Sequence, residues 1–445
     1  MKCENFHISP PYQHLSESDS IDRMQPATGT ALREQGHRKT HMNTLSASFD
    51  IVTPMFLGSA DPTKPEGIRS SSVKGALRFW WRALNWSRAF ASHGSDQNAA
   101  LRLLHADESR LFGHSATEKS GGQGVFLMQV IDRSGKAQEQ PFGTGFDNGI
   151  LYLLGMGLGS FKDGNHCTRW GLPANGSFDL RLLFRPGTPQ GDIASVVQAV
   201  QVFGLLGSLG SRARHGLGSV ALTSLRCEGL DLPAWTVPTT VEAYRSALIA
   251  LLADARRAPG LPPLSAFSTE SRLDLSMQRS GKDAAMKLLA DLGREQQAYR
   301  SYGKDGKVNG KPSERKFVSD HDLVREVANG RPPSSAPQRV VFGLPHNYFF
   351  SSDNAKVDVN YRPNGDEARR ASPLLLHIHR LGEGQAVAVH TLLRALFLPG
   401  DRPGVTMKPG RGRAIDNVPV TVDWSVLTRY LDRFKPLSPA DWATL

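Results

Sequence analysis

A glycine-rich stretch with three cations has the residue types that phosphate binding needs. It runs from Gly204 to Ser219 as GLLGSLGSRARHGLGS and places Arg212, Arg214 and His215 among five glycines. Glycine lets a backbone turn sharply and approach a ligand closely, and neighbouring cations attract an anion. The stretch therefore predicts a phosphate-binding loop, with a tight turn between a helix and a strand as the simpler alternative.

Known nucleotide-binding motifs are absent from the chain. The 445 residues contain no GxxxxGK[ST], and no GxGxxG is followed by an acidic residue that could hold a ribose. A mononucleotide or dinucleotide site is therefore disfavoured, and we expect no cofactor.

A second group of cations lies on a predicted helix that begins near Ser70. Apolar residues recur at helical spacing and predict a buried stripe: Val73, Leu77, Trp80 and Leu84. Lys74, Arg78 and Arg82 are four residues apart and fall on a neighbouring stripe. No acidic residue lies between Glu66 and Asp96 to pair with them, which favours a basic edge that binds an anion over a merely solvated face. Trp81, a weaker candidate for the core than Trp80, is a candidate for stacking on bases.

The charge of the chain points to a polyanionic partner. Lysine and arginine number 53 against 42 aspartates and glutamates, which gives a formal net charge of +11 and a pI near 9.6. Nucleic acid is the leading candidate, and a membrane surface is less favoured because the chain has no long basic amphipathic helix. No apolar run is long enough to span a bilayer and no secretory signal is recognisable, so we expect a cytoplasmic protein.

Catalytic and metal-binding sets are harder to find. The three cysteines are far apart, and His377 and His379 lack a third ligand at recognisable spacing, so we assign no metal site. His215 could act as a general base on an RNA 2′-hydroxyl, but no partner acid can be named. Phosphate binding without cleavage is the more economical interpretation.

The order of elements predicts an α+β fold. Expected strands lie near 45–57, 125–131, 149–154, 178–184, 219–225, 271–275, 339–342 and 373–380, and expected helices near 70–90, 194–206, 241–255, 282–299 and 385–397. This alternation is compatible with ferredoxin-like or RNA-recognition-type domains. Residues 1–43 are polar and without periodicity, which predicts a disordered extension, and the basic segment 301–316 is expected to be a mobile loop.

Several motifs resemble those of one CRISPR family. They are TPMFLG at 53–58, Arg69 with SVKGALRFWWRAL at 72–84, FG at 112–113, the glycine-rich stretch, and FGLPHNYF with RRASPLLLHIHRL within 342–381. Together they resemble the first subunit of the type III-B (Cmr) effector complex, a repeat-associated mysterious protein (RAMP). The extension 1–43 and the basic segment 301–316 match no motif of that family.

The resemblance implies two packed ferredoxin-like (RRM-like) RAMP domains with a glycine-rich loop, which we place at 44–235 and 236–445. It implies a non-catalytic subunit that caps the 3′ region of a guide RNA and helps to capture target single-stranded RNA, with other Cmr subunits as partners. The RNA-binding residues expected on this basis are Thr53, Arg69, Lys74, Arg78, Trp81, Arg82, Gly207, Gly210, Ser211, Arg212, Arg214, His215, Gly216 and Arg370. Their binding should follow backbone phosphates rather than base sequence, so neutralising Arg78 or Arg82 should lower the salt slope of binding by about one each.

Two alternatives remain open. The first is a metal-independent endoribonuclease that trims guide RNA precursors with His215 as general base. The second is a protein-interaction cap whose positive charge is incidental.

Overall fold

The computed structural model describes residues 43–58, 61, 67–94, 96–115, 122–162, 164–231, 233–382, 384–400 and 403–434. These residues belong to one compact unit. The extension expected over residues 1–43 lies outside the described residues, except for Asn43.

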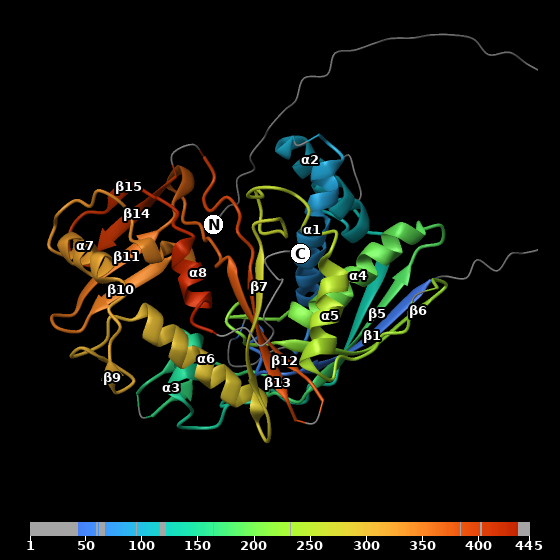
Figure 1. Ribbon diagram of the computed structural model, residues 1–445, viewed down its shortest axis with the longest axis horizontal. Coiled ribbons are helices and arrows are strands. Elements are labelled where there is room, and N and C mark those ends of the chain that lie inside the picture. Colours follow the sequence, from blue (N-terminus) through green and yellow to red (C-terminus); the bar gives the residue numbers. More distant parts are fainter. Residues whose placement is uncertain are drawn as a thin grey trace, which may run out of the picture. The chain divides into compact units, whose positions relative to one another are not determined.

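The first sheet has four antiparallel strands in the order β2-β5-β1-β6. Its strands and the two helices between them are β1 (Thr44–Ile51), α1 (Ser70–Ala91), β2 (Phe126–Asp132), β5 (Ser177–Phe184), α4 (Gln190–Leu206) and β6 (Val220–Glu228). The chain order β-α-β-β-α-β with this strand order is the split βαβ arrangement of ferredoxin-like folds (Figure 1). Alternate residues of β1 and β5 are buried against the helices, as the period-two pattern of β5 predicts.

The second sheet has three antiparallel strands in the order β12-β13-β7. Its elements are β7 (Arg272–Arg279), α6 (Ala284–Arg300), β12 (Leu374–Arg380), β13 (Ala386–Leu392) and α8 (Ser425–Leu431). The order β7-α6-β12-β13 repeats the first half of the split βαβ pattern, and within the described residues no fourth strand pairs with it. The α+β class is confirmed, but the second half is not a simple copy of the first.

A third sheet is formed by two strands that precede β12 in the chain and two that follow β13. Its strands are β10 (His346–Phe350), β11 (Ala355–Asn360), β14 (Gly404–Pro409) and β15 (Ile415–Pro419), and α7 (Val318–Ala328) packs on them. The remaining elements are α2 (Gln97–Phe112), α3 (Asn148–Leu154), β3 (Gly159–Ser160), β4 (His166–Cys167), α5 (Val241–Leu252), β8 (Lys307–Val308), β9 (Lys311–Pro312), η1 (Gln338–Phe342) and η2 (Pro363–Gly365).

Three expected elements have the wrong type. The expected strand near 149–154 is helix α3, whose first turn is capped by the Asp147 side chain. The expected helix near 385–397 contains strand β13, in which all seven residues are buried between two neighbouring strands. Short apolar runs do not distinguish a helix from a strand buried on both faces. The expected strand near 339–342 is the 3₁₀ helix η1, held by the Asp320 carboxylate, which accepts from the backbone N–H groups of residues 338 and 339.

The basic segment 301–316, expected to be a mobile loop, contains short regular elements. Strands β8 and β9 form a β-hairpin there, and two tight turns at Asp305-Gly306 and Asn309-Gly310 shape the segment. Asp-Gly and Asn-Gly are the strongest short-range signals for such turns, and the sequence contains both.

Buried residues from both halves of the chain share one core. The largest cluster joins the first sheet, α1, α4 and α5 to one face of the second sheet, through Leu273, Leu275, Val387 and Val389. The opposite face of the second sheet packs against α3, α6 and α8. The predicted boundary between residues 235 and 236 stays a prediction.

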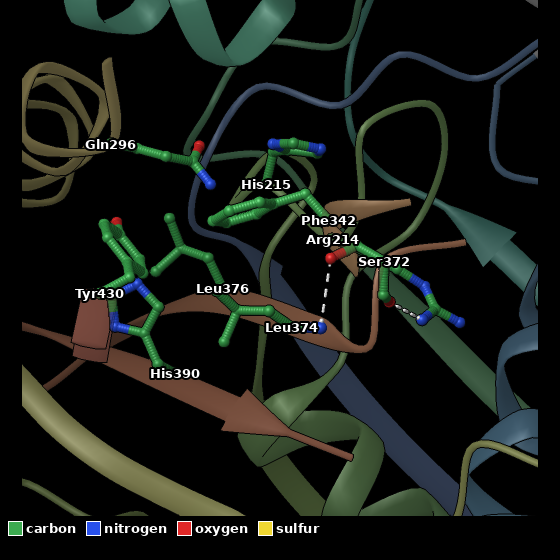
Figure 2. Close-up of a pocket in the computed structure, with 9 residues that line it drawn as sticks. All are labelled: Arg214, His215, Gln296, Phe342, Ser372, Leu374, Leu376, His390 and Tyr430. Carbon is green, nitrogen blue, oxygen red and sulfur yellow. Dashed lines mark hydrogen bonds between the residues drawn. The ribbon is translucent and has the colours of Figure 1, made fainter. Parts of the chain in front are cut away.

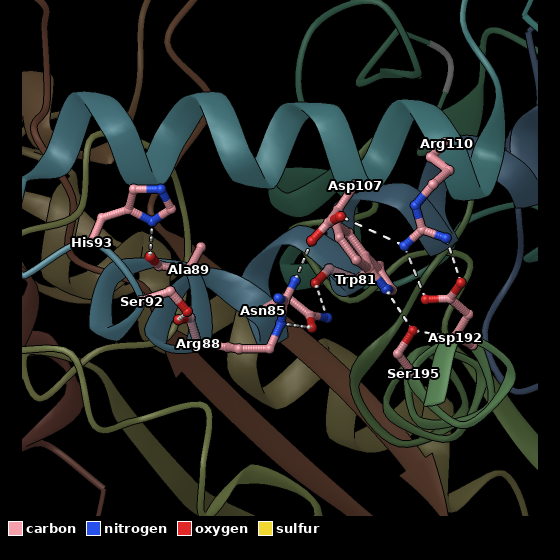
Figure 3. A network of polar contacts seen from close by, with 10 residues as sticks. All are labelled: Trp81, Asn85, Arg88, Ala89, Ser92, His93, Asp107, Arg110, Asp192 and Ser195. Atoms are coloured by element: carbon pink, nitrogen blue, oxygen red, sulfur yellow. Dashed lines mark hydrogen bonds and ion pairs between the residues drawn. The ribbon is translucent and has the colours of Figure 1, made fainter. Parts of the chain in front are cut away.

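Polar contacts bind α1, α2 and α4 together (Figure 3). Asp107 on α2 pairs with Arg88 on α1 at 2.7 Å, and Arg110 on α2 pairs with Asp192 on α4. The Trp81 indole N–H donates to the Ser195 hydroxyl at 3.1 Å. These contacts fix α1 between its neighbours and so position its basic edge.

Candidate nucleic-acid interface

The glycines of the predicted loop are required by the protein's own packing. Gly210 has φ +89° and Gly218 has φ +63°, in the left-handed region that favours glycine. A Cβ at Gly210 would lie 2.4 Å from the Phe56 carbonyl oxygen, and one at Gly218 would lie 2.0 Å from the Leu209 carbonyl oxygen. The close approach that these glycines permit is therefore to neighbouring backbone, which favours a structural role for both.

Thr53 and Ser211 hold the loop against the segment that follows β1. The Thr53 hydroxyl donates to the Gly216 carbonyl at 2.7 Å and accepts from the Ser219 N–H at 3.0 Å. The Ser211 N–H donates to the Phe56 carbonyl at 2.7 Å. Thr53 is fully buried, so its hydroxyl serves the fold, contrary to its prediction as an RNA contact.

The other end of the loop is bound to strand β12. The Leu376 N–H donates to the Arg214 carbonyl at 3.0 Å, and the Arg214 guanidinium donates to the Ser372 carbonyl (Figure 2). Gly207 and Gly216 are both buried, and a Cβ at Gly216 would meet the Leu376 side chain. The loop thus joins the first sheet to the second, and only Ser208 and residues 210–215 remain accessible.

Five arginines gather around this accessible part. We call them the arginine cluster: Arg212, Arg214, Arg300, Arg369 and Arg370. The charges of Arg300 and Arg369 lower the pKa of Arg212, after the larger effect of burial, and burial together with Arg370 lowers the pKa of Arg214 to about 10. Both groups stay protonated at neutral pH.

Side chains of the arginine cluster donate hydrogen bonds to main-chain carbonyls. Arg212 donates through Nε to the Leu154 carbonyl at 2.9 Å, and Arg370 donates to the Leu396 carbonyl at 3.2 Å. The Arg300 guanidinium lies 4.3 Å from the Phe342 ring centre. Within the described part of the chain, no carboxylate forms an ion pair with any member of the cluster. Its positive charge is therefore uncompensated.

His215 lies among these cations beside a small enclosed cavity. Burial, followed by the charges of Arg212 and Arg300, lowers the pKa of His215 to about 3. The cavity is about 10 Å³, room for about one water molecule, and is lined by Arg214, His215, Gln296, Phe342, Ser372, Leu374, Leu376, His390 and Tyr430 (Figure 2). A histidine with this pKa is a weak base, whereas general bases work best with a pKa near the operating pH.

The basic edge of α1 differs from the arginine cluster in its charge balance. Arg78 Nε and Arg82 Nη1 each lie 2.5 Å from Glu108 Oε1, and the Glu108 side chain is only 4% exposed. The expectation that nothing pairs with these arginines is therefore wrong, because α2 brings Glu108 onto them. Lys74, half-buried beside them, has its pKa lowered by burial and by the charge of Arg78.

The other predicted residues lie in varied surroundings. Trp81 is 1% exposed and packs edge-on against Phe112, so it offers no face to a base, contrary to its prediction. Arg69 precedes the first turn of α1 and donates to the Gly58 carbonyl at 2.7 Å. One contact links the two basic regions, since the Arg214 guanidinium lies 5.2 Å from the ring centre of Phe79 on α1.

Two members of the cluster were not predicted. Arg369 directly precedes Arg370 in the RRASP motif, and that doublet is the signal that could have included it. Arg300 ends helix α6 and has no sequence signal that relates it to a loop 88 residues earlier. Only folding brings these two side chains to Arg212.

No group of three or more His, Cys, Asp or Glu side chains in the described residues is placed to hold a metal ion. His377 Nε2 and His379 Nδ1 lie 3.4 Å apart, and both side chains are buried in the core. None of the described helices is both long enough and apolar enough to cross a membrane.

Comparison with known proteins connects part of the chain to one superfamily. Residues 48–221, which include the second half of β1, all of α1 and α4, and the glycine-rich loop, match the sequence model of the RAMP superfamily. The RAMP resemblance is confirmed over this segment. No curated protein sequence matches the chain.

Solved CRISPR proteins resemble the fold at low identity. The crystal structure of apo Cmr1 from Pyrococcus furiosus aligns over 88% of this chain and 97% of its own, with 17% identity and a TM-score of 0.47. A chain of the type III-B Cmr-beta complex bound to cognate target RNA aligns over 88% and 99%, with 12% identity and a TM-score of 0.46. A chain of a type IV-B CRISPR complex aligns over 44% and 96%, with 17% identity and a TM-score of 0.28.

Proposed function

We propose that this chain is a non-catalytic RNA-binding subunit of a type III-B CRISPR (Cmr) effector complex, acting in the cytoplasm. In this role it binds the 3′ region of the guide RNA and helps to capture target single-stranded RNA, with other Cmr subunits as protein partners. The RAMP match over residues 48–221 supports the family, and the motif resemblance supports the position in the complex.

The arginine cluster is the observation that supports RNA as the ligand. Guanidinium groups crowded without carboxylates repel one another, and an anion relieves that repulsion. Arg369 is exposed and Arg212 is only partly buried, so a phosphate can reach both from solvent. Planar guanidinium groups bind phosphate oxygens in pairs, which suits a sugar–phosphate backbone.

The nuclease alternative has no comparable support. The pKa of His215 is about 3, and its surroundings are cationic and largely closed. A base that accepts a proton poorly at neutral pH cannot activate a 2′-hydroxyl efficiently. We therefore place cutting on other subunits of the complex.

Salt-dependent RNA binding tests the proposal. The double variant Arg212→Gln/Arg369→Gln removes two solvent-accessible guanidinium groups of the cluster. Each lost contact to single-stranded RNA should lower the slope of log affinity against log salt by about 0.7, so the pair should lower it by about 1.4. Arg102→Gln/Arg257→Gln makes the same change in net charge at exposed arginines outside the cluster and should leave the slope unchanged. Equal slopes for the two double variants would refute the assignment.

The position in the complex needs a separate measurement. We expect that the tagged chain, purified from its host at moderate salt, carries short RNAs that share one repeat-derived 5′ end followed by varied spacers. RNA of random sequence, or none, would contradict the type III-B assignment.

A further inference from the structure

The β8–β9 hairpin carries a second concentration of positive charge that matches no motif of the resembled family. Two tight turns with left-handed central residues form it, at Asp305-Gly306 with φ +50° and +69° and at Asn309-Gly310 with φ +50° and +76°. Lys304 and Lys307 flank the first turn and exchange backbone hydrogen bonds of 3.1 and 2.9 Å. Mirror-image turns of this kind suit Asp-Gly and Asn-Gly, so the hairpin conformation is encoded locally.

The base of the hairpin is fastened to the body of the protein. The Glu314 carboxylate accepts two hydrogen bonds of 2.7 Å from Arg433, which also pairs with Glu295 on α6 at 2.9 Å. Val308, inside the hairpin, is 7% exposed. These contacts hold the hairpin in one place, so its cations are presented in a fixed arrangement.

The hairpin presents more positive charge than its surroundings compensate. Five exposed cations occupy it and the residues just after it: Lys304, Lys307, Lys311, Arg315 and Lys316. Of the two acidic residues in this segment, Glu314 is already bound by Arg433, which leaves Asp305. Like charges directly opposite one another in a hairpin, as at Lys304 and Lys307, are destabilising by themselves. A bound polyanion removes that penalty.

Aromatic groups beside the lysines distinguish nucleic acid from an acidic protein surface. Tyr302 stacks on His321 with ring centres 3.9 Å apart and planes inclined by 13°. The Arg315 guanidinium lies 5.6 Å from the Tyr302 ring centre. Flat aromatic and guanidinium groups beside a row of cations are the combination with which proteins hold the bases and phosphates of single strands.

We propose that the β8–β9 hairpin is a separate contact for the sugar–phosphate backbone of single-stranded RNA. Lys304, Lys307 and Lys311 bind phosphates, and the Arg315 side chain stacks on a base. Only residues 301–306 separate Arg300 of the arginine cluster from β8, so one strand of RNA can reach both. This inference rests on the proposed function only in taking RNA as the ligand.

The test is a triple variant, Lys304→Gln/Lys307→Gln/Lys311→Gln, in the full chain. Three lost phosphate contacts should lower the salt slope for a fluorescein-labelled, unstructured RNA of 30 nucleotides by about 2, and should weaken binding at least tenfold at 0.15 M salt. The matched control, Lys136→Gln/Lys162→Gln/Lys282→Gln, neutralises three exposed lysines on other segments and should behave as the wild type. Replacing the three hairpin lysines by arginine should retain the wild-type slope, which separates loss of charge from damage to the fold.

The outcomes separate this inference from the proposed function. A normal slope in the hairpin variant, beside a reduced slope in Arg212→Gln/Arg369→Gln, overturns the hairpin contact and leaves the function standing. Normal RNA binding with loss of the other Cmr subunits on purification also overturns it, and assigns the hairpin to an acidic protein surface. A wild-type chain that binds no RNA removes both proposals.

Discussion

The ion-paired group formed by Glu108, Arg78 and Arg82 allows the sharpest test of the structure. Both guanidinium groups lie 2.5 Å from the same carboxylate oxygen, and the Glu108 side chain is 4% exposed. The arginine side chains are about a third exposed, at 31% and 33%, so each can turn to solvent if its partner is lost. Glu108 has no such freedom. The free energy of unfolding should therefore depend on which side of the pair is removed.

The double variant Arg78→Gln/Arg82→Gln leaves a buried carboxylate without a cation. Removing the partners of a buried charge costs about 3–5 kcal/mol, and we expect a loss of about 3 kcal/mol in the free energy of unfolding, measured by urea denaturation. Each single variant keeps one guanidinium on Glu108 and should lose about 1.5 kcal/mol. Adding Glu108→Gln to the double variant removes the stranded charge and should recover about 2 kcal/mol.

The recovery by Glu108→Gln is the decisive comparison. A triple variant that is less stable than the double variant would refute the argument that the stranded carboxylate causes the loss. The same proteins report on RNA. Two arginines that share one carboxylate leave one net positive charge, so the double variant should lower the salt slope by about 0.7 rather than by one for each arginine. A decrease of 1.4 would show that Glu108 does not compete with RNA for these side chains.

Three further outcomes are expected. Gly218→Ala should destabilise the protein by about 3 kcal/mol in urea denaturation, because its Cβ would meet the Leu209 carbonyl, whereas Gly191→Ala, with nothing within 4 Å, should be neutral or stabilising. His390 is buried, which lowers its pKa to about 3 in the folded protein, against about 6.5 in the unfolded chain. Between these pH values unfolding takes up a proton, so stability is complete above about pH 7 and falls as the pH drops toward 3. In urea titrations between pH 4 and 6, the free energy of unfolding should rise with pH less steeply in His390→Gln than in the wild type, by about 1.4 kcal/mol per pH unit. An unchanged slope would contradict the buried neutral state of His390. His215→Ala should leave RNA intact and uncut in EDTA, as in the wild type, and fragments with 2′,3′-cyclic phosphate ends that vanish in the variant would establish the nuclease alternative.

Much of the fold could be predicted because local patterns determine it. The apolar stripe of α1 and the alternation of β5 correspond to buried faces, since helical and strand periodicities directly express which residues point inward. The Asp-Gly and Asn-Gly turns of the β8–β9 hairpin are local signals too, and their prediction failed only because the segment lacks apolar periodicity. Strand β13 failed for a different reason, since burial on both faces removes the alternation that marks a strand.

The features of the candidate site also divide into those that the sequence determines and those that depend on the tertiary structure. The sequence alone determined the net charge, the RAMP motifs and the presence of glycines and arginines in one loop, because these are properties of residue type and spacing. Only the tertiary structure decided which cations are free to bind an anion. It placed Glu108 on Arg78 and Arg82, and it placed Arg300 and Arg369 beside Arg212 with no carboxylate of the described residues paired to them. Charge compensation depends on distances between residues far apart in the chain, and these distances are set by how helices and sheets pack.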